Sequence, residues 1–280
     1  MSKPQLVCVT GLPRSGSTLL CQLLAEHPDI FCDGMSSPLL GALQTLRGHL
    51  SDSEFWLAQL DGGFEKAYAK LQRSCQAFAA AWWAETDCPV VVDKHRSWLN
   101  QIELALELDP NVRMLVCVRE LGQIFGSIEA QHRKTLWLDF PDDLANLSPY
   151  ARAEALFASK GVVGGPLRSI QAIQDRSEEE QSRLFFVVFE HLISEPVAVM
   201  NDLYDWLELE PHKLDSQNLT VRPHEADSYY RFKYRHVTNS NIAPPQPHTI
   251  SSRIDGELKD SYGWFYGLFY PGLLDRKATT

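Results

Sequence analysis

The chain has 280 residues, of which 44% are hydrophobic and 22% are charged, a composition typical of a soluble globular protein. Its formal net charge of −10 argues against binding nucleic acid, an anionic membrane surface or a long acidic polysaccharide through a generally basic surface. The six cysteines are scattered, mostly in apolar runs, and lack the spacing of metal ligands. They predict free thiols in a reducing compartment and no metal site.

The chain shows no internal repeat and no clear linker, so a single domain over residues 1–280 is expected. The first predicted strand begins close to Met1, which leaves no room for a signal peptide. No apolar run approaches the roughly 20 residues of a membrane span. We therefore expect a cytoplasmic protein without a membrane partner.

The most informative stretch is LVCVTGLPRSGSTLLCQLLA, residues 6–25. An apolar run predicts a strand, a loop with Gly11 and Gly16 follows, and an apolar-periodic helix begins directly after it. Backbone N–H groups at such a helix start bind phosphate, and glycine lets the backbone approach the anion closely. The spacing is that of a Walker A loop, except that Ser17 replaces the lysine and Arg14 places the positive charge inside the loop. The loop therefore predicts a phosphate site without the lysine of an ATP or GTP site.

Further along the chain, short apolar runs alternate with helical patterns. The runs predict four more strands, at 30–32, 88–93, 112–118 and 184–189. The helical patterns predict helices at about 98–108, 121–133 and 197–207, and in the C-terminal part from 249 to 270. Such alternation predicts a parallel sheet covered on both faces, a three-layer α/β/α fold.

Two segments, about 36–87 and 134–182, are predicted to be helical insertions. In the first, apolar residues recur at helical spacing from Phe64 to Trp82 and predict one amphipathic helix with a buried stripe. The segment from Asn239 to Pro247, which contains three prolines, is predicted to be an exposed loop.

Polar residues follow the predicted strands at the points where the strands end. Asp93-Lys94-His95 follows one strand and Arg119 the next, with Ser127 a little over two helical turns further on. Ligands of parallel α/β sheets bind beyond the carboxyl ends of the strands. We therefore expect these residues to converge with the phosphate loop on one edge of the sheet.

Together with FEHLISEP at 189–196, these motifs resemble the PAPS-dependent sulfotransferases, which transfer a sulfuryl group from 3′-phosphoadenosine 5′-phosphosulfate (PAPS) to a hydroxyl or amine. The opening GLPRSGSTLL is most similar to the branch that contains tyrosylprotein, carbohydrate and many bacterial sulfotransferases. The resemblance covers about 5–35, 88–133 and 184–210 and implies a P-loop NTPase-like fold. It explains the missing Walker lysine, because the donor has no γ-phosphate and no Mg²⁺ to hold.

The resemblance also implies roles for particular residues. The phosphate loop would bind the 5′-phosphosulfate through backbone N–H groups and hydroxyls, and its members are Pro13, Arg14, Ser15, Gly16, Ser17, Thr18 and Leu19. Arg119 and Ser127 match the family's pair on the ribose 3′-phosphate, and a guanidinium with a hydroxyl suits that dianion. Phe189 matches an aromatic residue near the adenine, and Arg253 lies in a segment similar to one that closes over the cofactor as a phosphate ligand.

The reaction needs a base for the acceptor proton, cations near the leaving oxygen, and alignment of both reactants. Lys94, Arg14 and the loop N–H groups meet the second need. His95 is one candidate base, since an unperturbed imidazole is partly neutral near pH 7. However, cytosolic members place their histidine two residues after the lysine, not directly after it. Asp33 is the other candidate, because it stands where members nearer this branch supply a carboxylate.

The sequence thus predicts a sulfotransferase that uses PAPS, releases adenosine 3′,5′-bisphosphate and modifies a small hydroxylated acceptor. Tryptophans in or near the variable segments favour a partly apolar acceptor: Trp56, Trp82, Trp83, Trp98 and Trp137. One alternative is a P-loop small-molecule kinase, which predicts a lysine at position 17 and an Asp, here Asp93, that holds Mg²⁺. The other is a non-catalytic adenosine-phosphate-binding homologue. The oligomeric state is left open.

Overall fold

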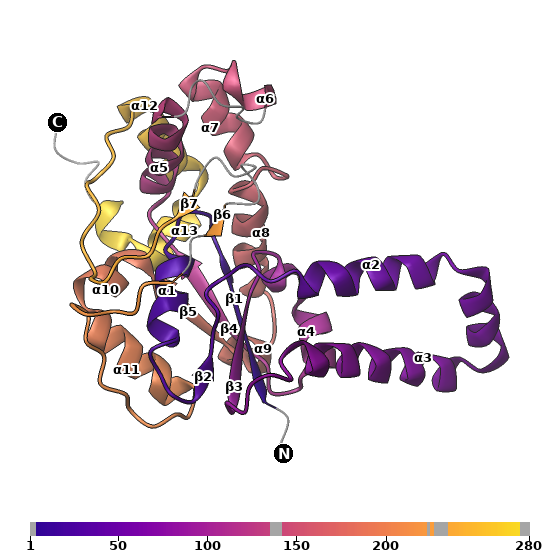
Figure 1. Ribbon diagram of the computed structural model, residues 1–280. Coiled ribbons are helices and arrows are strands. Elements are labelled where there is room, and N and C mark those ends of the chain that lie inside the picture. The colour runs from indigo at the N-terminus through magenta and orange to yellow at the C-terminus, as the bar shows by residue number, and fades with distance from the viewer. Residues whose placement is uncertain (1–3, 135–141, 223–224, 227–234, 275–280) are drawn as a thin grey trace.

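The computed structural model describes residues 4–134, 142–222, 225–226 and 235–274. Its centre is a five-stranded parallel sheet with the strand order β2-β3-β1-β4-β5 (Figure 1). The strands are β1 (Gln5–Gly11), β2 (Ile30–Phe31), β3 (Val90–Lys94), β4 (Arg113–Val118) and β5 (Leu184–Val188). All five predicted strands are therefore present, with ends that differ by one or two residues from the predicted ones.

Helices cover both faces of the sheet, and the alternation of side chains along β1 shows how. Leu6 and Cys8 face one hydrophobic cluster, whereas Val7 and Val9 face the other. The second cluster is closed by α1 (Ser17–Leu24) and α11 (Pro196–Trp206). The first is closed by helices that include α4 (Ile102–Leu108), α5 (Leu121–Lys134), α8 (Gly164–Ile173), α12 (Ser252–Ser261) and α13 (Gly263–Phe269). The predicted three-layer α/β/α architecture is confirmed.

Both predicted insertions are helical. The first forms a hairpin of α2 (Leu39–Ser51) and α3 (Glu54–Trp82), which projects from the body of the protein (Figure 1). The second contains α6 (Asp142–Ala145), α7 (Pro149–Phe157), α8 and α9 (Glu178–Ser182). The remaining short elements are the 3₁₀ helices Trp98–Gln101 and Pro271–Leu273, the helix α10 (Phe189–Ser194), and the antiparallel pair β6 (Glu225–Ala226) and β7 (Arg235–His236).

One prediction for the first insertion was wrong. The apolar stripe from Phe64 to Trp82 is not a core stripe, because only Ala67 and Ala79 of α3 are buried. The reason is that α3 packs against α2 and α4 and leaves much of its surface in solvent. The neighbouring Trp83 is the tryptophan that reaches the core, while Trp82 is exposed.

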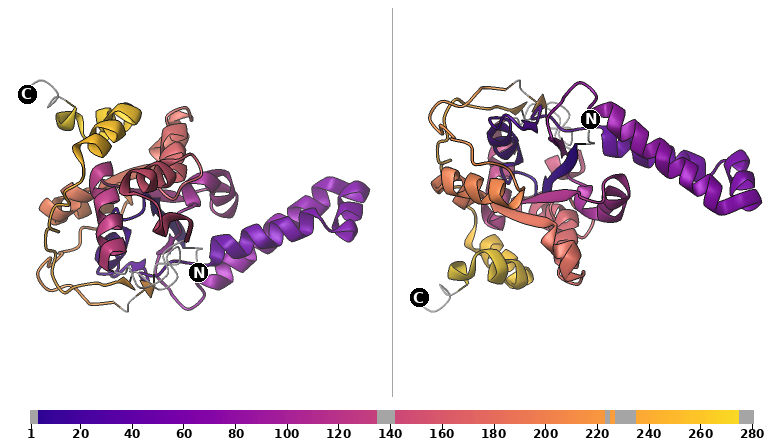
Figure 2. Two further views of the ribbon diagram at one scale, coloured as in Figure 1. Left: turned by 90° about the horizontal axis from the view of Figure 1, so that it is seen from above. Right: turned by 90° about the horizontal axis from the view of Figure 1, so that it is seen from below.

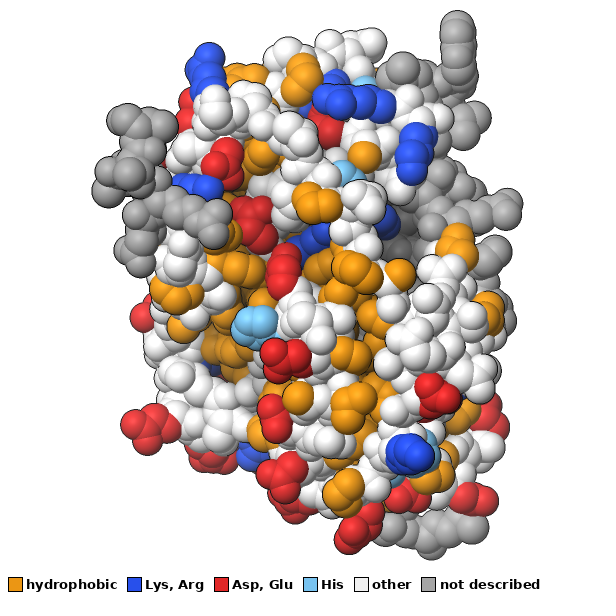
Figure 3. Space-filling view, turned by 90° about the vertical axis from the view of Figure 1, so that its left-hand side faces the viewer, with side chains coloured by type: hydrophobic (Ala, Val, Ile, Leu, Met, Phe, Trp, Pro, Cys, Tyr) orange, Lys and Arg blue, Asp and Glu red, His pale blue; other side chains and the backbone are white. Residues whose placement is uncertain are grey.

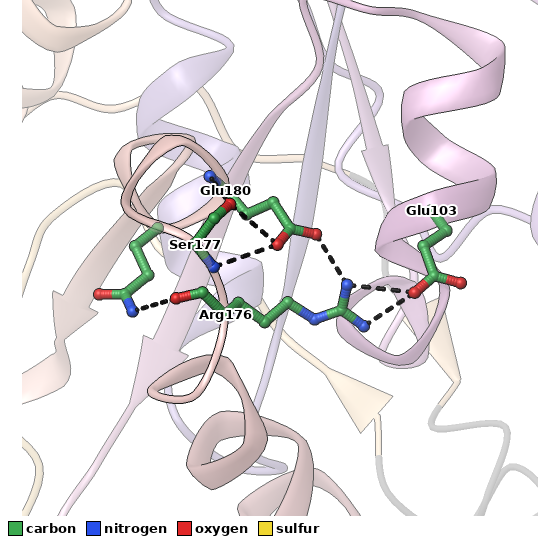
Figure 4. A network of polar contacts seen from close by, with 5 residues as sticks. Glu103, Arg176, Ser177 and Glu180 are labelled. Carbon is green, nitrogen blue, oxygen red and sulfur yellow. Dashed lines mark hydrogen bonds and ion pairs between the residues drawn. The ribbon is translucent and has the colours of Figure 1, made fainter.

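The second insertion is fixed to the body by ion pairs. Arg152 of α7 forms a buried bidentate pair with Glu129 of α5, with N–O distances of 2.6 and 2.9 Å. Before α9, Arg176 bridges Glu103 of α4 and Glu180, and Glu180 completes a capping box with Ser177 (Figure 4). These contacts join the insertion to helices on the same face of the sheet.

None of the helices in the described ranges is both long enough and apolar enough to cross a membrane.

Candidate active site

The phosphate loop turns sharply between β1 and α1. Arg14 has a φ of 58° and Gly16 a φ of 88°, so two nearby residues adopt the left-handed conformation. Such a turn directs successive backbone N–H groups toward one point, which makes an anion-binding concavity. A methyl group built on Gly16 would lie 2.5 Å from a ring carbon of Phe189, so this position requires glycine for space as well as for φ. The hydroxyl of Ser15 is turned inward and donates to the Leu12 carbonyl at 2.5 Å.

The end of β4 supplies the cation opposite the loop. Arg119 is buried, and its Nη1 donates to the Arg14 carbonyl oxygen at 3.0 Å. Its guanidinium carbon lies 4.4 Å from the ring centroid of Phe189, a cation–π contact. Arg14 in turn donates from Nε to Ser127 Oγ at 3.2 Å. The structure therefore brings Arg14, Arg119, Ser127 and Phe189 together, as the sequence predicted.

Arg119 has unused hydrogen-bonding capacity. Its Nε is buried and has no hydrogen-bond partner among the residues that the structure describes. Burial lowers the pKa of Arg119, an effect opposed by the nearby carboxylate of Glu190. An arginine remains charged at neutral pH despite such a shift, so a desolvated cation with a free donor faces the loop. An anion with several acceptor oxygens would satisfy it.

A cleft of about 520 Å³ opens beside these residues. Its lining residues come from the phosphate loop and α1, from β4 and α5, from α10, and from the segment 237–248. They include Arg14, Gly16, Ser17, Thr18, Leu19, Arg119, Ser127 and Phe189, all predicted as site residues. Pro13 and Ser15 are buried behind the loop and do not line this cleft.

The sequence predicted Asn239 to Pro247 only as an exposed loop, whereas in the structure the segment 237–248 forms one wall of the cleft. Two glutamines hold it there. Gln22 of α1 donates to the carbonyls of Thr220 and Asn239 at 2.9 and 2.8 Å. Gln123 of α5 donates to the His248 carbonyl at 3.0 Å and accepts from the His248 N–H at 2.8 Å. The wall is thus fixed to both helices that border the cleft.

Several residues of the site were missed from the sequence. Lys134 lines the cleft, and it stands seven residues after Ser127, so helical spacing alone placed it on the same face of α5. Gln22 and His248 also line the cleft, but no local motif points to them because their positions depend on long-range contacts.

A smaller cavity of about 60 Å³ lies beneath the phosphate loop, at the end of β3. It is lined by Lys94 and Arg96 together with loop residues and Ser36. Lys94 Nζ donates to the Gly34 carbonyl at 2.7 Å. The strand β3 ends at Lys94 and the chain turns at Arg96, and in this turn Lys94 and Arg96 line the cavity whereas His95, between them, does not.

The two candidate bases differ in their surroundings. Nδ1 of His95 accepts the backbone N–H of Ser97 at 3.2 Å, so the neutral ring carries its proton on Nε2. Burial lowers the pKa of His95, an effect strengthened by the charge of Arg96. Asp33 is exposed, and its Oδ1 accepts the N–H of Met35 at 2.8 Å. Asp33 directly precedes Gly34, whose carbonyl oxygen accepts the hydrogen bond from Lys94 Nζ.

Asp93, the residue that a kinase would use for Mg²⁺, is buried in the core. Its Oδ1 accepts the indole N–H of Trp98 at 2.6 Å. Burial raises the pKa of Asp93, although hydrogen bonds from Ser37 and Trp98 oppose the rise. Trp98 is fully buried as the partner of this carboxylate and so lines no acceptor pocket.

The predicted phosphate ligand Arg253 and the predicted acceptor-pocket tryptophans do not line the cleft in the part of the chain that the structure describes. Arg253 does not line the cleft: it pairs with Glu257 at 3.1 Å and lies over the ring of Tyr150, 4.1 Å from its centroid. Of the tryptophans considered for an acceptor pocket, Trp56 lines an apolar groove on the helical hairpin, and Trp137 lies outside the described residues.

Two carboxylates next to the cleft residues accept hydrogen bonds from two tyrosines. Glu120 accepts the hydroxyl of Tyr266 at 2.6 Å, and Glu190 accepts that of Tyr270 at 2.7 Å. Burial and these carboxylates raise the pKa of both tyrosines well above the usual range. Because Glu120 and Glu190 follow Arg119 and Phe189 directly in the chain, the network fixes the two residues that line the cleft.

Charge is distributed unevenly despite the net negative total. On the face shown in Figure 3, most Lys and Arg side chains lie in the upper half, whereas Asp and Glu gather over the lower half. The upper half is the end at which the parallel strands terminate at their carboxyl ends (Figure 1). An anionic ligand would therefore be attracted to the edge of the sheet that carries the cleft.

Comparisons with known proteins identify the family of the chain. Residues 4–213 match the model of the sulfotransferase family, and the chain belongs to that family. A protein-tyrosine sulfotransferase of Drosophila melanogaster is 29% identical over 118 residues, which cover 41% of this chain and 23% of that protein. The chain thus matches less than a quarter of that relative's length.

Two solved sulfotransferase domains are similar to this chain. A sulfotransferase domain from the curacin biosynthetic pathway is 16% identical, with a TM-score of 0.53, and the match covers 93% of this chain and 98% of that domain. A sulfotransferase domain from the Synechococcus PCC 7002 olefin synthase is 20% identical, with a TM-score of 0.48 over 77% of this chain and 80% of that domain. The predicted P-loop NTPase-like α/β fold is confirmed by the first of these likenesses together with the observed sheet.

Proposed function

We propose that this protein is a PAPS-dependent sulfotransferase that acts on a hydroxyl group of a small acceptor and releases adenosine 3′,5′-bisphosphate. The observation that carries the proposal is the meeting of Arg14, Arg119 and Ser127 around a phosphate loop that has Ser17 in place of the Walker lysine. Family membership supplies the reaction class. The arrangement of cations suits a nucleotide with two separate anionic groups.

The donor set fits such a nucleotide. The first N–H groups of α1, with the hydroxyls of Ser17 and Thr18, would hold the 5′-phosphosulfate. Arg119 and Ser127 would hold the 3′-phosphate, and the buried, unpartnered Nε of Arg119 would gain an acceptor. When bound, the donor supplies the sulfuryl group and a leaving phosphate oxygen.

Lys94 and Asp33 are the residues to which we assign the chemistry. Lys94, held at the cavity beneath the loop, would stabilise negative charge on the leaving oxygen. Asp33 would accept the proton of the acceptor hydroxyl. Its carboxylate is exposed, and the next residue in the chain, Gly34, accepts a hydrogen bond from Lys94 Nζ through its carbonyl oxygen. His95 is the weaker candidate, since its Nδ1 lone pair is already occupied by the Ser97 N–H.

Ligand-dependent thermal stability tests the proposed donor. Adenosine 3′,5′-bisphosphate at 100 times its Kd should stabilise the protein by about 2.7 kcal/mol, because a ligand that binds only the folded state shifts unfolding. The matched control is adenosine 5′-monophosphate, which lacks the 3′-phosphate and should stabilise far less. Stabilisation by ATP with Mg²⁺ but not by the bisphosphate would instead support the kinase alternative.

Turnover tests the reaction itself. The protein is incubated with PAPS and a library of small hydroxylated compounds, and mass spectrometry detects products that have gained a sulfuryl group. A protein that binds the bisphosphate and sulfates no compound across such a library would support the alternative of a non-catalytic homologue.

A further inference from the structure

His248 is the histidine that lines the cleft. It ends the segment 237–248, which runs over the side of the body opposite the helical hairpin of α2 and α3 in both views of Figure 2. Its side chain packs against Gly126 of α5: a methyl group built on Gly126 would lie 2.3 Å from Cβ of His248 and 3.1 Å from Cγ. Gly126 directly precedes Ser127, the residue assigned to the 3′-phosphate. The imidazole therefore stands beside the proposed phosphate position.

The backbone of His248 is fixed by a single side chain of α5. The N–H of His248 donates to Oε1 of Gln123 at 2.8 Å, and its carbonyl oxygen accepts from Nε2 of Gln123 at 3.0 Å. Within the described residues, the hydrogen bonds of His248 all run through its backbone. Both nitrogens of the ring are thus available to a ligand in the cleft, one as a donor and one as an acceptor when the ring is neutral.

Three cations from three different elements act on this ring. They are Arg119 after β4, Arg14 of the phosphate loop and Lys134 at the end of α5, and all three line the same cleft as His248. The wall itself supplies no further charge, because His248 is the only titratable residue from 237 to 250.

The carboxylates of the neighbouring elements are engaged with other side chains. They accept hydrogen bonds as follows: Glu120 from Tyr266, Glu190 from Tyr270, and Glu129 from Arg152. The other histidine of α5, His132, is buried and does not line the cleft. Burial lowers the pKa of His248, and the charges of Arg119, Arg14 and Lys134 lower it further. The ring is therefore mainly neutral at pH 7.

A phosphate dianion bound among these cations would reverse the balance of charge at the ring. An opposite charge within about 4–6 Å of an imidazole favours its protonated form. A protonated imidazole donates from both nitrogens, and a charge-assisted hydrogen bond to a phosphate oxygen is stronger than a neutral one. The binding of the dianion and the protonation of His248 would thus stabilise each other.

We propose that His248 takes up one proton from solvent when the nucleotide binds and, as an imidazolium, donates a hydrogen bond to the 3′-phosphate beside Arg119 and Ser127. The inference rests on the proposed function, since its ligand is adenosine 3′,5′-bisphosphate. The proton stays on the ring while the nucleotide is bound and returns to solvent when it leaves.

The proposal fixes the sign of a pH dependence. The pKa of His248 lies below its ordinary value in the free protein and rises above that value in the complex. Between these two values the complex holds one proton more than the separate protein and ligand. The affinity should therefore fall as the pH rises, by up to about tenfold per pH unit. The ligand does not add to this effect above pH 7, because the second pKa of a phosphate monoester is about 6.

Titration calorimetry with adenosine 3′,5′-bisphosphate tests the proposal on the full-length chain. Measured at pH 7 in Tris and in HEPES, whose ionisation enthalpies differ, the wild type should take up a proton on binding. Its Kd should rise about tenfold between pH 7 and pH 8.5, the effect of one pKa unit. His248→Gln should take up no proton and bind about tenfold more weakly at pH 7, yet match the wild type within about twofold at pH 8.5.

Two further variants and one ligand serve as controls. His248→Lys keeps a positive charge at every pH used, so at pH 8.5 it should bind about tenfold more tightly than the wild type, without proton uptake. His49→Gln, which changes an exposed histidine of α2, should take up a proton like the wild type. Adenosine 5′-monophosphate, which lacks the 3′-phosphate, should bind the wild type without proton uptake. Circular dichroism checks the fold of each variant.

The outcomes separate this inference from the proposed function. Binding of the bisphosphate to the wild type without proton uptake would overturn the inference and leave the proposed function standing. Uptake that persists in His248→Gln would do the same, because another group would then carry the proton. A wild type that does not bind the bisphosphate at all would overturn both.

Discussion

Arg119 connects the backbone of the phosphate loop to the proposed 3′-phosphate site. It donates to the carbonyl of Arg14, packs over Phe189, and keeps a free buried Nε. Because Arg119 is buried, its charge interacts strongly with nearby groups. Keeping that charge buried without an anion beside it costs free energy. The affinity of the site for a 3′-phosphorylated nucleotide should therefore depend heavily on this one side chain.

Replacing Arg119 by alanine should weaken the binding of adenosine 3′,5′-bisphosphate roughly ten- to hundred-fold, the effect of losing a charge-assisted contact worth about 1.5–3 kcal/mol. Isothermal titration calorimetry measures the change. Arg113→Ala is the matched control, because Arg113 lies at the other end of β4 and packs on Trp206 instead. Equal affinities of the wild type and Arg119→Ala would contradict the assignment.

The base can be identified by comparing two substitutions that leave the cations in place. Asp33→Asn should reduce kcat by about 10²–10⁴-fold, the usual contribution of a general base. His95→Gln should retain most of the activity, because the Nδ1 lone pair of His95 already accepts the Ser97 N–H and its neutral ring carries the proton on Nε2. Both variants should bind the bisphosphate like the wild type. The opposite pattern, with activity lost only in the His95 variant, would assign the base to His95.

Residues within motifs were predictable, and residues placed by long-range contacts were not. Arg14, Arg119, Ser127 and Phe189 lie together as expected, because each follows directly from a strand end or from helical spacing. Arg253 was expected near the phosphate, but it pairs with Glu257 one helical turn away, a local alternative that the sequence already offered.

At the scale of single elements, α5 positions more of the site than its motif suggests. It carries Ser127 and Lys134 into the cleft and holds the wall of the cleft through Gln123. Close approach is possible because Gly126 faces His248: a methyl group built on Gly126 would lie 2.3 Å from the His248 Cβ. The helix and the wall therefore fit each other over more than one turn.

Gln123→Ala should weaken bisphosphate binding by up to about thirtyfold while the fold stays intact, because two hydrogen bonds to the wall are lost at about 1 kcal/mol each. Calorimetric titration measures the affinity, and circular dichroism checks the fold. Gln181→Ala is a suitable control, since Gln181 also donates to backbone carbonyls but lies far from the cleft in α9. An affinity that Gln123→Ala leaves unaltered would show that the wall does not contribute to binding.

Element type was predicted well for the strands and less well for the first insertion. Runs such as Val90–Val92 are buried on both sides, and their β-branched residues predict a strand directly. The stripe of α3 has helical spacing, but spacing shows only that one face is apolar. What covers that face depends on tertiary or quaternary contacts, so the predicted burial was wrong.

At the scale of the whole molecule, the second insertion depends on the buried pair of Arg152 and Glu129. Arg152→Ala should lower the free energy of unfolding by about 3–5 kcal/mol, because it leaves Glu129 buried without its partner. The midpoint of thermal unfolding should fall by on the order of 10 °C. Arg183→Ala removes an exposed pair with Glu179 and should change the midpoint little. Similar midpoints for the two variants would contradict this account.

The central strand β1 has a consequence for how the chain reaches its fold. Both neighbours of β1 are remote in sequence: Gln5 pairs with Val90, and Val7 pairs with Arg113. The N–H of Leu6 also donates to the carboxylate of Asp109, 103 positions away. Strands joined only by such long loops pair slowly, because loop-closure entropy is lost before any contact forms. We therefore expect the phosphate loop, although encoded within the first 20 residues, to acquire its shape late in folding, after β3 and β4 have joined β1.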